Sequence, residues 1–220
     1  MVQEIMNLWD VKKETMHIKL SLKQDKSNLV AFSSVLHHGF QVKTRVGSSI
    51  KNLLCGQFNV AEDYLVRRIQ TIFIDGKPVD DEETAIVRDG STVALSIALG
   101  GLLGATLRKG GLLAGFRSTI THQEEGTTPN TCVEGIVTIK LFNQLASELG
   151  PMFLKKGIWL KKDDAESILK NRFDILRSFL LGVEKDGREI TQDQLATLNW
   201  SEAPKIVTLK AFSRSLVGDS

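Results

Sequence analysis

Two neighbouring stretches of sequence indicate a small sheet: IQTIFIDGKPVDD at residues 69–81 and VRDGSTVALSIALGG at residues 87–101. Each contains a run rich in Val, Ile, Thr or Phe and an Asp-Gly step. Such runs favour strands, and Asp-Gly favours tight turns in which φ is positive. We therefore expect strands at 69–74 and 92–98, separated by turns.

The residues before this sheet indicate two more strands and a helix. Residues 16–23 and 40–46 alternate polar and apolar side chains, which is the period of a half-buried strand. Ser48 and Ser49 then provide a helix N-cap, and apolar residues follow at helical spacing up to Ala61. The predicted order is strand, strand, helix, strand, strand.

This order, closed by Gly100-Gly101, resembles the ubiquitin-like β-grasp sulfur carriers, the family of the molybdopterin-synthase small subunit and the thiamine carrier. The resemblance covers about residues 16–101. It implies a β-grasp fold, and it implies that Gly101 accepts activated sulfur through a terminal carboxylate. Gly101 is internal in this chain, so a carrier would require processing after Gly101 or Gly111. The alternative, which we favour, is that the glycine pair only lets the backbone turn or pack closely.

The second half of the chain repeats the alternation of strands and helices after a polar linker at 121–132. Strands are expected at 136–142, 157–161 and 205–212. Asp163-Asp164 is expected to cap a helix, and Asp186-Gly187 to turn a hairpin. The fold class is therefore predicted as α+β: an N-terminal β-grasp unit and a second small α/β unit, for which a degenerate second β-grasp stays open. The expected organisation is a leader at 1–14, a β-grasp-like domain at 15–101, a Gly-rich segment and linker at 102–132, a second domain at 133–212 and a tail at 213–220.

A duplication would give the two halves equivalent sheets. The sheet of the first half would contain residues 17–22, 69–74 and 92–98. The sheet of the second half would contain residues 137–142, 178–183 and 207–212. The alternative is that Asp-Gly turns recur because they suit hairpins. The residues expected in the first core are Ile18, Leu20, Leu53, Leu54, Ile72, Ile74, Val93 and Leu95.

Residues 99–116 form an unusual segment in which Gly-Gly-Leu-Leu occurs at 100–103 and again at 110–113. The apolar side chains cannot all face one small core if the glycines bend the backbone. Apolar area should remain exposed, and contiguous exposed area of that kind marks interaction sites. We expect a protein partner or a second copy, giving a homo-oligomer. The candidate contact residues are Leu102, Leu103, Leu107, Leu112, Leu113 and Phe116.

Between the two Gly-Gly pairs lies a candidate anion site. Arg108, Lys109, Gly110 and Gly111 would place two cations beside exposed backbone amides. The alternative is a solvated turn, since no phosphate-loop sequence surrounds it. The acidic run at 80–83 is expected to be a solvated loop.

Composition and motifs exclude several classes of function. A net charge of +2 and scattered basic pairs predict no nucleic-acid partner. The uncharged stretch at 90–107 is of minimal length and begins inside a strand pattern, so we expect no membrane span. Cys55 and Cys132 are far apart, and the start of the chain lacks a secretory pattern, which favours the cytoplasm. No catalytic, nucleotide-binding or zinc spacing is present, so no cofactor or metal is expected. The sequence thus favours a non-enzymatic protein-binding or assembly module, with an enzyme whose site is unrecognised left open.

Overall fold

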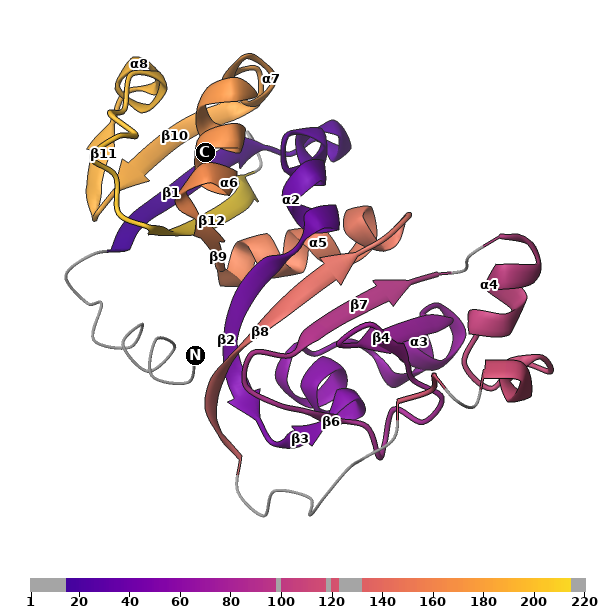
Figure 1. The fold of residues 1–220 in the computed structure, drawn as a ribbon. Helices are drawn as coiled ribbons and strands as arrows, with labels where there is room; N and C mark the ends of the chain where they lie inside the picture. Colours follow the sequence, from indigo (N-terminus) through magenta and orange to yellow (C-terminus); the bar gives the residue numbers. More distant parts are fainter. Residues whose placement is uncertain (1–14, 98–99, 118–119, 123–131, 215–220) are drawn as a thin grey trace, which may run out of the picture. The chain divides into compact units, whose positions relative to one another are not determined.

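The computed structural model describes residues 15–97, 100–117, 120–122 and 132–214 and confirms the α+β class (Figure 1). The expected leader and nearly all of the expected tail and linker lie outside these residues. Contacts group the chain into two compact units, residues 36–149 and residues 1–35 together with 150–220. We call these the inserted unit and the outer unit, because the first interrupts the second in sequence.

The inserted unit contains a mixed sheet with the strand order β5-β4-β7-β8-β2. The pair β7–β8 is parallel and the other neighbours are antiparallel. Short strands β3 and β6 pair separately. The strands are β2 (Phe40–Val46), β3 (Ser48–Ser49), β4 (Thr71–Ile74), β5 (Lys77–Pro78), β6 (Ile86–Val87), β7 (Thr92–Ser96) and β8 (Val133–Leu141).

Helices between β2 and β4 close the core of the inserted unit. The helix predicted up to Ala61 contains the π-helix η3 (Asn52–Gln57), and a separate helix that was not predicted, α3 (Glu62–Arg67), follows it. The Ser49 hydroxyl accepts a hydrogen bond from the Asn52 amide at 3.2 Å, as expected of an N-terminal cap. Leu53 and Leu54 are fully buried. The remaining helices are α4 (Gly101–Leu107) and η4 (Ala114–Arg117), while α2 (Ser33–His38) and α5 (Leu145–Lys156) cross the unit boundaries.

In the outer unit the strands are ordered β11-β10-β1-β12-β9. Here β1 and β12 are parallel, from Thr15 opposite Ile206 to Lys23 opposite Arg214, and the other neighbours are antiparallel. The strands are β1 (Thr15–Lys23), β9 (Ile158–Lys161), β10 (Leu180–Lys185), β11 (Arg188–Ile190) and β12 (Ile206–Arg214). The helices are η2 (Lys26–Phe32), α6 (Lys162–Glu166), η5 (Ser167–Asn171), α7 (Phe173–Arg177) and α8 (Gln192–Ala196).

The strands of the two units follow the same scheme, although they come from different parts of the chain. In each, a parallel pair is flanked by antiparallel strands, and helices connect an edge strand to the strand beyond the pair. Asp-Gly turns also occupy equivalent corners. Asp75 and Gly76 join β4 to β5 with φ values of 51° and 80°, and Asp186 and Gly187 join β10 to β11 with 49° and 79°.

The expected partners of two strands are wrong. β1 does not pair with β4 or β7 but with β10 and β12, and β8 pairs with β2 and β7. The contacts therefore divide the strands differently from the expected ranges 15–101 and 133–212. Alternation is a local property that buries one face of a strand beside any suitable neighbour, so it does not select the partner. All eight residues expected in the core are buried, each at most 2% exposed.

Candidate functional site

The glycine-rich segment, residues 100–122 without 118–119, follows β7 and contains α4 and η4. Gly100 precedes α4, and Gly101 opens it with φ of +71°. Both are exposed, and a Cβ at either would meet nothing within 4 Å. The glycine pair therefore serves a backbone turn in this structure, and no close packing requires it.

Arg117 is the main anchor of this segment. Its side chain is 3% exposed and forms a two-pronged ion pair with Asp80, at 2.6 and 3.1 Å. The guanidinium also donates to the carbonyl oxygens of Thr106 and Arg108 and to the hydroxyl of Thr121, at 2.6, 3.3 and 2.8 Å. An arginine has five N–H donors, and these five hydrogen bonds give each of them an acceptor. One buried side chain thus ties α4, the turn after it and the residues after η4 to the loop that follows β5.

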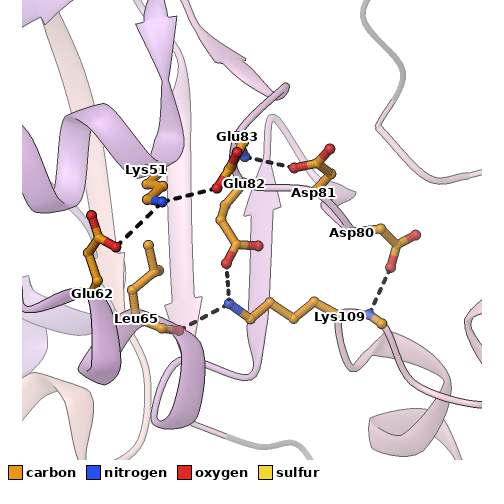
Figure 2. Close-up of polar contacts among 9 residues, drawn as sticks. Lys51, Glu62, Leu65, Asp80, Asp81, Glu82, Glu83 and Lys109 are labelled. Carbon is orange, nitrogen blue, oxygen red and sulfur yellow. Dashed lines mark hydrogen bonds and ion pairs between the residues drawn. The ribbon is translucent and has the colours of Figure 1, made fainter.

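Lys109 forms a second anchor, which Figure 2 shows. Its ammonium group donates to Glu82 at 2.9 Å and to the carbonyl oxygen of Leu65 at 3.0 Å, and its side chain is 11% exposed. Its backbone amide donates to the carbonyl oxygen of Gln70 at 2.9 Å. The segment is therefore held against both α3 and the acidic loop by interactions that little water reaches.

In the acidic run at 80–83, Asp81 and Glu83 are exposed, as expected of a solvated loop, whereas Asp80 and Glu82 are partly buried and form ion pairs. Asp80 and Glu82 hold the two anchors Arg117 and Lys109. Lys51 lies between Glu83 at 3.0 Å and Glu62 at 3.5 Å (Figure 2). Hydrogen bonding to Glu83, with desolvation opposing it, sets the pKa of Lys51 above its usual value. Sequence reasoning missed Asp80, Glu82 and Arg117 as functional residues, because nothing local distinguishes a charge that finds a buried partner.

The predicted anion site is filled by the chain itself. The Lys109 ammonium group forms an ion pair with Glu82, and the Gly110 amide donates to the Asp80 carboxylate at 3.3 Å. The Gly111 amide donates to the carbonyl oxygen of Arg108 at 3.2 Å, and the Arg108 side chain is exposed. An external anion would have to displace the Asp80 carboxylate, so the geometry gives no vacant anion site here.

The anchored segment exposes large apolar side chains. Leu112 and Phe116 are 102% and 85% exposed, Leu102 is 75% exposed, and Ile120, which the sequence did not single out, is 54% exposed. Leu107 and Leu113 are partly buried, and the side chain of Leu103 lies outside the described residues. We call Leu102, Leu112, Phe116 and Ile120 the apolar surface.

A separate cluster links α3 to the first turn of α5 within the inserted unit. Arg68 donates to Glu148 at 2.5 Å and to Gln144 at 2.7 Å, and the Tyr64 hydroxyl donates to Glu148. The bond from Arg68 is the main cause of a lowered pKa of Glu148. Burial, followed by the bond to Glu148, raises the pKa of Tyr64. Because the charges are satisfied internally, the cluster fits a structural role.

The two cysteines are free, Cys55 partly buried and Cys132 exposed. Cys55 is partly buried, and desolvation followed by the nearby Glu62 charge raises the pKa of its thiol, which lowers its reactivity. No group of three or more His, Cys, Asp or Glu side chains among the described residues is placed to hold a metal ion. Within the same part of the chain, no helix has both the length and the apolar character to cross a bilayer.

Comparison with protein families, with curated proteins and with solved structures finds no match to this chain.

Proposed function

We propose that this chain is a non-enzymatic protein-binding module on a β-grasp scaffold, and that the apolar surface is its binding surface. The observation that carries the proposal is the combination of exposed large apolar side chains with a backbone held by the buried Arg117 side chain and its partner Asp80. Because the backbone is already ordered, binding does not carry the entropic cost of ordering a flexible loop. Exposed apolar side chains on an ordered segment are typical of interaction sites.

The scaffold part of the proposal is supported by the arrangement of the sheets. In each unit a parallel pair lies at the centre, antiparallel strands flank it, and helices connect an edge strand to the strand beyond the pair. A β-grasp has this mixed sheet with a helix across it. In the inserted unit, however, the parallel strands β7 and β8 are the last two strands in sequence. The relationship to sulfur carriers would therefore be one of strand arrangement with altered connectivity.

The size of the apolar surface favours a second copy as the partner. The exposed fractions of its side chains add up to about three complete side chains, whose burial would contribute about 5–9 kcal/mol. Association costs about 4–15 kcal/mol, so one such surface against a polar partner is marginal. A twofold dimer buries the surface of both copies in one contact and doubles this contribution.

The test is self-association of the full chain in sedimentation velocity, at concentrations up to about 1 mM, where association of about −4 kcal/mol is detected. Leu112→Asp with Phe116→Asp should shift the protein to monomer, because two charges would be buried in the contact. The matched control is Val30→Asp with Ile175→Asp, at exposed apolar positions of the outer unit, and it should associate like the wild type.

Two outcomes contradict the proposal. A wild-type chain that is monomeric throughout this range would remove the second copy as partner. A Leu112→Asp, Phe116→Asp chain that unfolds would mean that these side chains belong to the core. Circular dichroism of both variants distinguishes unfolding from dissociation.

The arrangement of β8 weighs against a processed sulfur carrier. A carrier ending at Gly101 or Gly111 would be separated from β8, which pairs with both β2 and β7 in the inserted unit. Loss of this strand would expose Val137, Ile139 and Leu141 and their partners to water. Intact mass of the protein from native cells decides the matter, since a species ending at either glycine would support the carrier.

A further inference from the structure

The N-terminal arm, residues 15–35, belongs to the outer unit but is joined to the rest of it only through the whole inserted unit. It contains β1 and η2 and the beginning of α2. The other part of the outer unit starts at residue 150. Every contact between the arm and residues 150–214 is therefore noncovalent and separated by at least 114 residues of chain, the length of 36–149.

The arm completes the core of the outer unit. Its strand β1 lies between β10 and β12 and is hydrogen-bonded to both. Lys19 forms an ion pair with Glu184 at 3.0 Å. After the strand, Asn28 donates to the Ser213 hydroxyl at 3.3 Å, and Arg172 donates to the Ser33 hydroxyl, also at 3.3 Å. The apolar residues of the arm that are buried are Met16, Ile18, Leu20, Leu22, Ala31, Phe32 and Val35.

We propose that this arm is exchanged between two copies of the chain, so that β1 of each copy completes the sheet of the other copy's residues 150–214. The site between β10 and β12 recognises the strand by backbone hydrogen bonds and by the apolar side of β1. A second copy offers the same strand with the same register. Exchange therefore preserves every contact within the outer unit, and it is the usual low-cost route from a monomer to an intertwined dimer.

Gly39 lies between α2, which begins in the arm, and β2. Its φ is +122°, and a Cβ there would lie 3.0 Å from Cγ2 of Thr138. Glycine takes up such a conformation without the steric cost of other residues. Hinges consist of a few residues at the ends of elements that absorb changes in φ and ψ, and Gly39 has this position.

The balance between the two forms is set by concentration. Within one copy the arm meets its site at an effective concentration on the order of millimolar, and exchange competes when the protein reaches that range. Because the arm carries the buried residues of a central strand, release is a local unfolding step and interconversion is slow. Refolding at high concentration is therefore the condition that populates the exchanged dimer.

The experiment traps the arm with disulfide bonds in the full chain. Lys19→Cys and Glu184→Cys place two thiols at directly opposite positions of the antiparallel pair β1–β10, in a background of Cys55→Ser and Cys132→Ser. The matched control is Gln41→Cys with Thr138→Cys, opposite positions of β2 and β8 inside the contiguous inserted unit. Both proteins are denatured and reduced, refolded at about 1 µM or about 1 mM, oxidised, and separated on a denaturing gel without reductant.

The Lys19→Cys, Glu184→Cys protein should give at least about tenfold more covalent dimer after refolding at the higher concentration, whereas the control should stay monomeric at both. Equal monomer in both proteins, or equal dimer in both, would overturn the exchange. The unmodified chain provides a second measurement that needs no substitution: after refolding at about 1 mM it should elute partly as a dimer that persists on dilution. Elution only as monomer would also overturn the proposal. A dimer formed by the apolar surface alone dissociates on dilution and does not link positions 19 and 184.

Discussion

Thr71 shows how a single residue departs from the otherwise apolar pattern of the core. It begins β4, is fully buried, and its hydroxyl oxygen has no hydrogen-bond partner among the described residues. A buried hydroxyl without a partner costs free energy, and valine has nearly the same shape.

We therefore predict that Thr71→Val raises the free energy of unfolding by about 1 kcal/mol. Urea unfolding followed by circular dichroism measures it. The control is Thr92→Val, at a partly buried position of the neighbouring strand β7. A destabilised Thr71→Val protein would mean that the hydroxyl has a partner outside the described residues.

Glu148 predicts an acid-dependent part of stability. Arg68 and Tyr64 lower its folded-state pKa below its unfolded value of about 4.3. A lowered folded-state pKa stabilises the folded state at pH above the unfolded value, and this stabilisation is lost as the pH falls through the folded-state pKa. The contribution should be at most about 1 kcal/mol, because the pair is partly exposed.

The prediction for Glu148→Gln is a smaller loss of stability between pH 5 and pH 3 than in the wild type, measured by urea unfolding at both pH values. Glu189→Gln removes an exposed carboxylate of β11 and is the control for the loss of one charge. Equal losses in the wild type and in Glu148→Gln would show that the cluster does not couple to acid unfolding.

At the level of single residues, the sequence predicted burial well and polar partners poorly. Ile72 and Leu95 lie on the buried side of strands whose alternation is visible locally. Arg117, in contrast, lies among glycines and apolar residues in the sequence, and this local pattern predicts an ordinary solvated side chain. Its burial depends on Asp80, 37 residues earlier, which no local pattern connects to it.

The glycine-rich segment illustrates what decides the structure of an element. Its helices α4 and η4 are short, contain glycines, and would be marginal in isolation. They are ordered here because Arg117 and Lys109 fix them to the loop that follows β5. Tertiary ion pairs, and not helix propensity, therefore hold the apolar surface in place.

We predict that Arg117→Ala destabilises the protein by about 3 kcal/mol, because it leaves Asp80 without its cationic partner and three further acceptors without their donor. Arg117→Lys should recover only part of this, since an ammonium group cannot form the two-pronged pair.

The control for this prediction is Arg108→Ala, whose side chain is exposed and which should change stability by less than about 0.5 kcal/mol. Amide hydrogen exchange should show faster exchange at Gly104 and Arg108 in Arg117→Ala, because their backbone bonds belong to α4. Unchanged exchange there would contradict the role of Arg117 as the anchor.

For the whole molecule, the division into units makes a prediction about fragments. Residues 36–149 are contiguous and contain all strands of the inserted unit, whereas residues 150–220 lack β1, a central strand of the outer unit. A fragment of residues 36–156, which keeps α5 whole, should fold alone and unfold cooperatively.

The complementary fragment of residues 150–220 should not fold by itself, because the missing strand leaves both β10 and β12 unpaired on one side. Nuclear magnetic resonance spectra of both fragments would decide this through the dispersion of their amide signals. A well-dispersed spectrum for residues 150–220 would contradict the assignment of β1 to that unit.

The sequence by itself determined the α+β class, the positions of the main strands, the Asp-Gly turns and the buried side of each core strand. These features follow from local chemistry, since side-chain alternation and turn conformations depend on neighbours in the chain. Only the tertiary structure decided that β1 joins the C-terminal strands, that β8 joins the N-terminal ones, and that Arg117 is buried. Two strands with the same alternation fit either sheet locally, so the choice between them depends on contacts across more than a hundred residues, which a local pattern does not encode.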